Sequence, residues 1–125
     1  MARFPQRSDL YWIPLEIEED GDKERPIVIV SRDELNRGDR VLVVPFYSQQ
    51  LEKRAKQKWC ALFKAGESGL KKDCVAKGDE IQLIDPMEIL WARGKLGRFN
   101  AEQMARVILA VRHAMRDPTA ETDDS

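Results

Sequence analysis

The apolar residues of this chain occur in short runs separated by polar turns, and β-branched and aromatic side chains fill most of the runs. This pattern is typical of β-strands. Five or six strands are predicted, at residues 10–15, 26–30, 40–46, 58–63, 73–77 and 80–84. In the last run, Ile81 and Leu83 alternate with Gln82, which predicts that the two apolar side chains share one face of the sheet.

The segments between the strands carry turn signals. Residues 16–24 are rich in acids and contain Gly21, so we predict a mobile loop there. Ser31 and Glu34 have the spacing of a weak capping box, which favours a turn or a single helical turn. Residues 49–57 are polar and are predicted to form a loop or a short solvated helix.

Two helices are predicted after the strands. Asp85 and Pro86 are typical of a helix N-terminus, and Glu88 completes a capping box. Gly94 predicts the end of this first helix, and Asn100 is predicted to cap the second, longer one. The apolar face of the second helix is formed at helical spacing by Met104, Val107, Ile108, Val111 and Met115.

Strands that follow one another without intervening helices argue against a doubly wound α/β fold. We therefore predict a mainly β (α+β) fold, a small and partly closed antiparallel barrel with a short helix and a C-terminal helix appended. A chain of 125 residues is short enough for one domain, which we place at residues 1–116. Residues 117–125 contain four acids and no large apolar side chain, so an acidic disordered tail is predicted.

The composition is that of a globular protein with a well-solvated surface, with 42% apolar and 34% charged residues. No apolar run can span a bilayer and no secretory signal is present, so we expect a cytoplasmic protein without membrane contact. Two cysteines, Cys60 and Cys74, and a single histidine argue against a zinc site, a disulfide scaffold and a phosphodiesterase with two histidines. That histidine, His113, lies inside the last predicted helix, where we expect a structural or surface role.

The net charge of −1 conceals an uneven distribution of charge. Residues 16–24 carry six acids and one base, whereas residues 53–77 carry eight bases and two acids. The basic segment is either a phosphate-binding surface or a lysine-rich coat that keeps the chain in solution. Charge alone does not decide between these two interpretations.

Common nucleotide-binding and hydrolase motifs, namely GxxxxGK[ST], GxGxxG and GxSxG, are absent from the chain. The acids gather in the two segments that are predicted to be least rigid, which disfavours a metal-dependent nuclease. We therefore expect no metal ion and no cofactor.

Polar clusters at two predicted strand ends remain as candidate chemistry. Arg25 precedes a buried strand and is held by the restricted backbone before Pro26. Tyr47, Ser48 and Gln49 follow the third strand. If neighbouring strands bring the clusters together, a guanidinium beside hydroxyl and amide donors suits a phosphate that gains charge in a transition state. Taken alone, each cluster is more often a polar cap at the edge of a sheet than a site.

Several segments of this chain resemble sequence motifs of the PemK/MazF toxin family, and they occur in the same order as in the family. The most specific are RPIVIVS at 25–31, similar to the family's Arg-Pro-Val-Val-Val strand, and VVPFYSQ at 43–49, similar to its Val-Pro-x-Thr-Ser-Gln segment. Looser matches are RSDLYW at 7–12, NR at 36–37, SGL at 68–70, DCV at 73–75, DEIQ at 79–82 and GKLG at 94–97. The resemblance covers residues 7–116.

This resemblance implies an SH3-like barrel with appended helices that assembles as a homodimer. It implies a metal-independent endoribonuclease, the toxin of a toxin–antitoxin pair, which cuts single-stranded RNA by attack of the ribose 2′-OH on the adjacent phosphate. Arg25 takes a catalytic position of the family, and we expect it to stabilise the phosphorane charge because a guanidinium does not normally deprotonate. Tyr47 aligns with the catalytic threonine, and Tyr47 or Ser48 is expected to supply a hydroxyl. The implied partner is a separate antitoxin, acidic and partly disordered, that covers the basic groove.

Departures from the family pattern fall at the expected site. Tyr47 replaces threonine, Ser8 replaces glycine, and Glu80 and Gln82 replace the glutamine and arginine of the last motif. They leave open a different cleavage sequence, a weakened enzyme, or a role for the Tyr47 ring in stacking on an unpaired base. Weaker candidates for RNA contact are Gln49, Lys53, Arg54, Lys56 and Gln82.

Two alternatives to the endoribonuclease stay open. One is an RNA- or protein-binding module of the same fold that does not cleave. The other is a toxin of this fold that acts on a protein target such as gyrase.

Overall fold

The computed structural model describes residues 4–19 and 21–118, and most of its regular structure is β-sheet. Its strands are β1 (Asp9–Glu19), β2 (Asp22–Ile29), β3 (Val41–Tyr47), β4 (Cys60–Phe63), β5 (Cys74–Lys77), β6 (Gln82–Ile84) and β7 (Gly97–Arg98). Its α-helices are α1 (Asp33–Asn36), α2 (Leu51–Ala55) and α3 (Ala101–Ala114), and 3₁₀ turns occupy η1 (Glu67–Gly69), η2 (Gly78–Glu80), η3 (Pro86–Glu88) and η4 (Trp91–Arg93).

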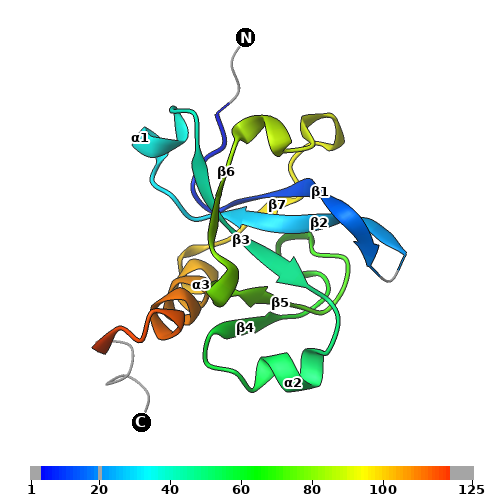
Figure 1. The fold of residues 1–125 in the computed structure, drawn as a ribbon, viewed down its shortest axis with the longest axis vertical. Coiled ribbons are helices and arrows are strands. Elements are labelled where there is room, and N and C mark those ends of the chain that lie inside the picture. The colour runs from blue at the N-terminus through cyan, green and yellow to red at the C-terminus, as the bar shows by residue number, and fades with distance from the viewer. Residues whose placement is uncertain (1–3, 20, 119–125) are drawn as a thin grey trace.

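The strands form one strongly bent sheet in which all the pairings are antiparallel (Figure 1). Its order is β4-β5-β3-β2-β1-β7, and β6 also pairs with β3. β3 is the centre, because one of its edges pairs with β2 and the other is shared between β6 and β5. The predicted class, a mainly β, partly closed antiparallel barrel with a short helix and a C-terminal helix, is confirmed.

Both faces of the central strands are buried, which explains why their sequences are continuous apolar runs rather than alternating ones. On one face, Val28, Val44 and Phe46 belong to a core that α3 covers with residues such as Val107. This core contains a cluster of aromatic rings, in which Phe63 stacks on a neighbouring phenylalanine at 4.6 Å between ring centroids. On the opposite face, a second core contains Ile27, Ile29, Val41, Val43, Ile84 and Ile89.

The prediction of a mobile loop at residues 16–24 is wrong. β1 continues to Glu19 and β2 begins at Asp22, so most of the acidic segment is a β-hairpin. Backbone hydrogen bonds between strands do not require apolar side chains, and charged side chains on an exposed hairpin remain solvated. Gly21, with a φ of 77°, supplies the left-handed backbone of the turn. The acidic composition therefore concealed a strand pair.

Two further local predictions are corrected. Ile81 and Leu83 do not share a buried face, because η2 delays the start of β6 to Gln82 and leaves Leu83 63% exposed while Ile84 is buried. Ser31 does not cap α1. Its hydroxyl instead contacts the side chain of Asn36 and accepts a hydrogen bond from a backbone amide of β3.

The helix predicted after Asp85 is only a pair of 3₁₀ turns, η3 and η4. The capping box of Asp85 and Glu88 is present, and Gly94 ends η4 as predicted. The short strand β7, between η4 and α3, was not predicted. Its two residues are too few to give a periodic signal.

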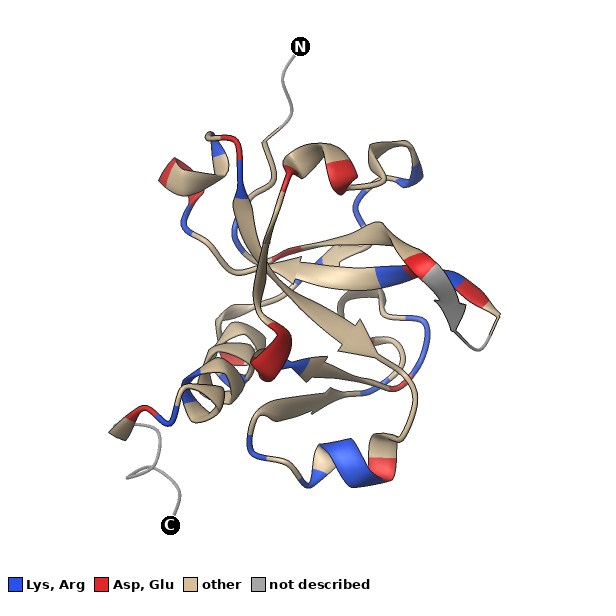
Figure 2. Cartoon of the chain, in the orientation of Figure 1, with Lys and Arg blue, Asp and Glu red and all other residues tan. Residues whose placement is uncertain are grey.

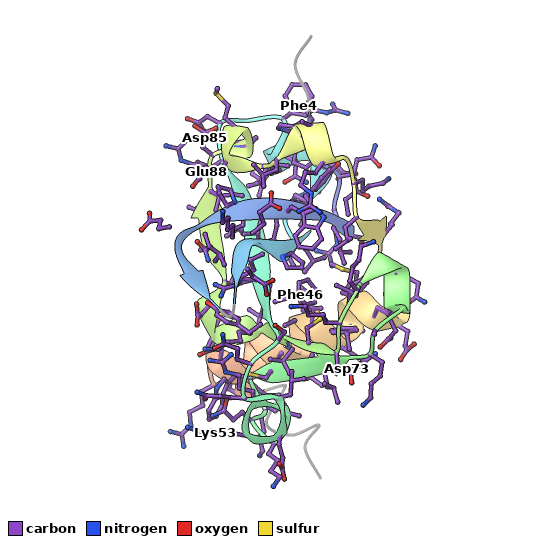
Figure 3. All side chains as sticks on the ribbon, turned by 90° about the vertical axis from the view of Figure 1, so that its right-hand side faces the viewer. Phe4, Phe46, Lys53, Asp73, Asp85 and Glu88 are labelled. Atoms are coloured by element: carbon purple, nitrogen blue, oxygen red, sulfur yellow. The ribbon has the colours of Figure 1, made fainter. Side chains whose placement is uncertain are left out.

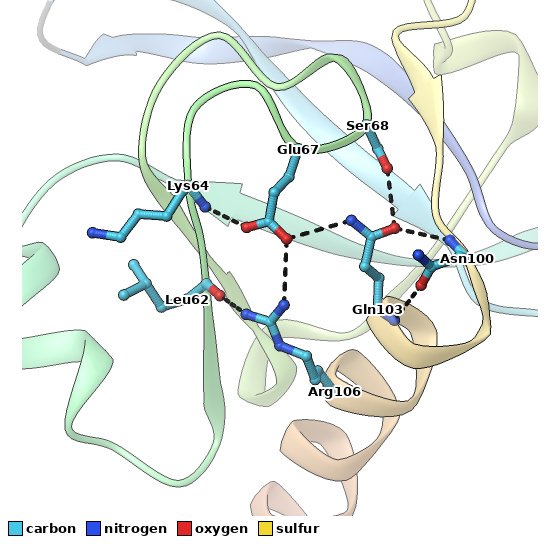
Figure 4. A network of polar contacts seen from close by, with 7 residues as sticks. All are labelled: Leu62, Lys64, Glu67, Ser68, Asn100, Gln103 and Arg106. Atoms are coloured by element: carbon cyan, nitrogen blue, oxygen red, sulfur yellow. Dashed lines mark hydrogen bonds and ion pairs between the residues drawn. The ribbon is translucent and has the colours of Figure 1, made fainter.

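Helix α3 begins at the predicted cap, where the Asn100 side chain accepts a hydrogen bond from the backbone amide of Gln103 at 2.8 Å. Gln103 and Arg106 also contact Glu67, so the first turns of α3 are tied to the segment between β4 and β5 (Figure 4). Of the predicted apolar face, Met104, Val107 and Val111 are buried and Ile108 packs against the core, whereas Met115 is exposed.

Beyond α3, Asp117 forms an ion pair with Arg112 at 3.2 Å. The predicted acidic tail lies outside the described residues from residue 119 onward. Among the described residues, no helix is long and apolar enough to cross a membrane.

Candidate active site

Arg25 and Tyr47 meet where β2 and β3 run side by side. The register pairs Ile27 with Pro45, and its continuation by two residues places Arg25 opposite Tyr47 on the same face of the sheet. The Arg25 guanidinium carbon lies 3.7 Å from the centroid of the Tyr47 ring. The structure thus brings together the two polar clusters, as expected if the strands beside them are neighbours.

A pocket opens at this end of the sheet, and its lining includes Arg25, Tyr47, Ser48 and Gln49. The apolar part of the lining comes from three different segments: Trp12, Leu15, Pro26, Phe46 and Leu70. The charged part comes from the β1–β2 hairpin and from the segment before β5: Asp22, Glu24, Lys71 and Lys72. An apolar pocket with a few polar groups beside it is the usual form of a small-ligand or base-binding site.

The Tyr47 ring is surrounded by positive charge. Besides Arg25, the guanidinium carbon of Arg54 lies 4.8 Å and the ammonium nitrogen of Lys77 lies 4.9 Å from the ring centroid. These three cations come from β2, α2 and β5, and cation–π attraction favours each contact. Arg54 also donates a hydrogen bond to the backbone carbonyl of Gln49 at 3.1 Å, which fixes α2 against the site.

Glu80 completes the cluster from η2. Its Oε1 accepts a hydrogen bond from the Tyr47 hydroxyl, and its Oε2 accepts one from Lys77 Nζ at 2.7 Å. Partial burial by itself raises the pKa of Glu80, but the hydrogen bonds from Lys77 and Tyr47 act in the opposite direction. The positive charge of Arg25 adds to that effect, and the pKa of Glu80 ends below its usual value. Glu80 is therefore a carboxylate at neutral pH.

The remaining candidates for RNA contact lie farther from this cluster. Figure 2 shows in blue the Lys and Arg positions on the ribbon of α2 and of the segment that follows it. Among them, Lys53 and Lys56 are exposed and do not line the pocket. Figure 3 shows Lys53 on α2, well apart from Phe46 in the pocket wall. Gln82 is exposed at the start of β6, and its side-chain amide is 3.4 Å from the backbone carbonyl of Glu80.

Two members of the cluster were missed as site residues. Lys77 was counted only in the basic segment, and Glu80 was noted only as a departure from the family pattern. Their positions depend on how β5 and η2 fold beside β3, which a local pattern does not contain. The sequence contained one signal for Lys77, which is the last residue of the predicted strand at 73–77. Arg25 and Tyr47 likewise stand directly beside predicted strands.

Other polar residues of the matching segments are structural. Asn36 is fully buried, and its side-chain amide donates a hydrogen bond to the Ser31 carbonyl at 3.0 Å, which closes the loop around α1. Asp9 is buried and pairs with Arg98 at 2.7 Å, which joins β1 to β7.

The cysteines and the histidine do not belong to the cluster. Cys60 and Cys74 are free thiols, and burial raises the pKa of the Cys74 thiol to about 12. His113 lies half-buried in α3, in agreement with its expected structural or surface role. Within residues 4–19 and 21–118, no group of three or more His, Cys, Asp or Glu side chains is placed to hold a metal ion.

Comparisons with known proteins identify the family and the fold of the chain. A family model described as "PemK-like, MazF-like toxin of type II toxin-antitoxin system" matches residues 6–115. Among solved structures, the Mycobacterium tuberculosis toxin MazF-mt6 superposes with a TM-score of 0.67 and 19% identity, over 86% of this chain and 96% of that one. A mycobacterial endoribonuclease in complex with its cognate antitoxin gives a TM-score of 0.65 and 18% identity, over 91% and 95% of the two chains.

MazF from Deinococcus radiodurans gives a TM-score of 0.64 and 15% identity, over 91% of this chain and 98% of that one. At such identities the superpositions establish the fold. Comparison with curated protein sequences yields no match.

Proposed function

The chain belongs to the PemK-like, MazF-like toxin family of type II toxin–antitoxin systems, and on that premise we propose that it is an endoribonuclease toxin. Its substrate is single-stranded RNA. The reaction is attack of a ribose 2′-OH on the adjacent phosphate without a metal ion, which leaves a 2′,3′-cyclic phosphate and a free 5′-OH.

The observation that carries this proposal is the contact of Arg25 with Tyr47 beside a pocket that Ser48 and Gln49 also line. A guanidinium at this place stabilises the negative charge that develops on the phosphorane oxygens. It does not act as a base, because a guanidinium remains protonated in proteins. The Tyr47 and Ser48 hydroxyls supply hydrogen bonds to the phosphate or to the leaving oxygen.

The RNA backbone follows the positive charge outward from the pocket. Gln49 and Arg54 lie at the site itself, and Lys53 and Lys56 extend the basic surface along α2. Gln82 contacts RNA from the exposed start of β6. Bases are read within the apolar part of the pocket, where the partly exposed Trp12 offers aromatic surface.

The test is to sequence RNA 5′ ends after the protein is induced in cells, with the parent chain and Arg25→Ala side by side. We expect new 5′ ends at a recurrent short sequence with the parent chain, and loss of at least roughly 100-fold in their frequency with Arg25→Ala. Arg40→Ala is the matched control, because Arg40 is exposed and precedes β3 at the end remote from Tyr47. Identical cut patterns from the parent chain and Arg25→Ala would show that Arg25 takes no part in the cleavage.

A second candidate, an RNA-binding module that does not cleave, is favoured by one observation. The Tyr47 ring covers the guanidinium of Arg25, and the Tyr47 hydroxyl already donates a hydrogen bond to Glu80. A chain of this kind would retard single-stranded RNA in a salt-sensitive gel assay and leave it uncut under all conditions. Cleavage by the purified chain excludes this candidate.

We also propose that the chain acts as a homodimer and is inhibited by a cognate antitoxin, a separate acidic and partly disordered chain. Solved relatives include a mycobacterial endoribonuclease in complex with its cognate antitoxin and MazE-MazF from Deinococcus radiodurans. The basic surface around α2 and the Tyr47 site complements an acidic segment. Light scattering of the purified chain gives its oligomeric mass. If a small acidic reading frame is found beside the gene, its co-expression should restore growth.

A further inference from the structure

The reaction needs a proton acceptor that the sequence did not identify. Attack by the 2′-OH releases a proton, and at neutral pH Arg25 is already protonated while the Tyr47 and Ser48 hydroxyls are poor bases. A carboxylate is the ordinary side chain for this task. Glu80 is one, and it is in direct contact with Tyr47 at the end of β3.

We propose that Glu80 is the general base and Tyr47 the general acid of the cleavage reaction, and that their hydrogen bond returns the proton between turnovers. This inference rests on the proposed endoribonuclease function and assigns roles within that same site. It follows from the position of Glu80, whose two oxygens are held by Tyr47 and Lys77 while 37% of its side chain stays accessible. The carboxylate is thus both fixed in place and open to a ribose.

The chemical step balances without any further reactant. Glu80 takes the proton of the 2′-OH as the 2′-oxygen forms its bond to phosphorus. The bond from phosphorus to the 5′-oxygen then breaks, and Tyr47 gives its phenolic proton to that oxygen. Glu80 is now protonated and Tyr47 is a phenolate, so transfer of the proton from Glu80 to Tyr47 along their hydrogen bond restores both groups.

The surroundings of Tyr47 suit the acid role. Arg25, Arg54 and Lys77 all lie within 5 Å of the ring centroid, as their distances of 3.7, 4.8 and 4.9 Å show. Three positive charges at this range stabilise negative charge on the ring as the proton leaves. The same charges assist the phosphorane, so a single cluster serves both stages of the reaction.

The groups that face Glu80 come from several elements. Lys77 of β5, Tyr47 of β3 and Arg25 of β2 favour its ionised form. Asp79 on η2 lies 3.8 Å from Lys77, and the Cys60 thiol of β4 is near enough to be influenced by both acids of η2.

Helix α3 approaches η2 through the backbone of Ala110 and Val111 at Gly78, where a Cβ would come within 2.6 Å of that backbone. This close packing fixes η2, and with it the position of the carboxylate. The groups that lower the pKa of Glu80, namely Lys77, Tyr47 and Arg25, come from β5, β3 and β2 rather than from α3.

The first test is the pH dependence of cleavage of a short single-stranded RNA that spans one mapped cut. We expect kcat of the parent chain to fall in acid as Glu80 becomes protonated, below the ordinary pKa range of a glutamate. Glu80→Gln keeps the size and the acceptor oxygen, and should lower kcat roughly 100-fold or more and remove the acidic limb. Asp39→Asn removes the same charge from an exposed residue before β3, at the end remote from Tyr47, and should retain both kcat and the acidic limb.

The second test separates base from acid with an RNA whose 5′-bridging oxygen is replaced by sulfur. A thiolate leaves without protonation, so Tyr47→Phe should regain most of its lost rate on this substrate. Glu80→Gln should stay slow, because the 2′-OH still has to lose its proton. Thermal melting of both variants shows whether each is folded.

Failure of the inference is distinct from failure of the proposed function. If the parent chain cuts no RNA, the endoribonuclease itself is rejected. If the parent chain cuts RNA but Glu80→Gln raises only KM, keeps the acidic limb, or loses no more activity than Asp39→Asn, only the base assignment is rejected. Absence of rescue of Tyr47→Phe by the sulfur substrate rejects the acid assignment.

Discussion

Polar residues in this chain serve either the fold or the site, and the structure separates the two groups. Asn36 is completely buried and holds a loop closed, whereas Arg25 is partly exposed and stacks on Tyr47 beside a pocket. Arg25 and Tyr47 could be selected from the sequence because each directly flanks an unambiguous apolar run, at residues 26–30 and 40–46. The role of Glu80 could not, because it depends on a 3₁₀ turn that only the packing of α3 explains.

Replacement of Asn36 by alanine should destabilise the fold without touching the site. The change leaves the carbonyl of Ser31 and the Ser31 hydroxyl without their buried partner, which costs about 1–3 kcal/mol. Urea denaturation measures the loss, and Asp39→Ala, an exposed change in the same loop, should alter the free energy of unfolding by less than about 0.5 kcal/mol. Equal stability of the Asn36 variant and the parent would contradict a structural role.

The buried thiol of Cys74 should make stability depend on alkaline pH. Burial raises the pKa of Cys74 from 9.0 to about 12, so the unfolded chain ionises first as pH rises. The contribution of Cys74 to the free energy of unfolding is fully present below pH 9. It decreases between pH 9 and 12, by up to roughly 1.4 kcal/mol per pH unit. Cys74→Ala should flatten the measured slope, and an unchanged slope would show that the thiol is not protected by the fold.

Among the elements, those with strong periodic patterns could be predicted and those fixed by tertiary contacts could not. β2, β3 and α3 are close to their predicted positions because their apolar runs are buried against two cores. The acidic hairpin was misjudged because its strands are held by backbone pairing and by ion pairs such as that of Asp22 with Lys72 at 3.0 Å. Contacts of these kinds produce no periodic apolar pattern in the sequence.

The cap of α3 gives a prediction at this scale. Asn100→Ala removes the acceptor for the Gln103 amide and should destabilise the protein by about 1 kcal/mol. Glu102→Ala, in the same turn but outside the capping box, should cost less than half as much. Thermal or urea denaturation of the two variants measures the loss of stability. Equal losses would show that the Asn100 cap contributes no more to stability than Glu102 does.

Helix α2 gives a second prediction, about RNA affinity. Arg54→Ala should weaken binding of a 2′-O-methylated, uncleavable RNA more than Lys53→Ala or Lys56→Ala, because only Arg54 contacts both Tyr47 and Gln49. Each variant that loses a phosphate contact should also reduce the salt dependence of the logarithm of affinity by about 0.7. If Lys53→Ala and Arg54→Ala weaken RNA binding equally, α2 contributes only its overall positive charge and no specific contact from Arg54.

For the whole molecule, the bend of the sheet is what creates the site. β3 pairs with β2 on one edge and with β5 and β6 on the other, so residues from β2, β3, β5, α2 and η2 converge at one end of it. The antiparallel barrel could be predicted from the succession of strands, and the meeting of Arg25 with Tyr47 from their order. Lys77 at the end of β5 and Glu80 in η2 join this site through the path of the chain around β5, and its only signal in the sequence was the place of Lys77 at the end of a predicted strand.

The central claim is that the Arg25–Tyr47 cluster cleaves RNA without a metal ion. Its most direct test is to incubate the purified chain with single-stranded RNA in excess EDTA and to determine the chemistry of the new ends. The account predicts 2′,3′-cyclic phosphate and 5′-OH ends from the parent chain, and a rate at least roughly 100-fold lower from Arg25→Ala. Ends that carry a 5′-phosphate, a requirement for added metal, or undiminished cleavage by Arg25→Ala would contradict it.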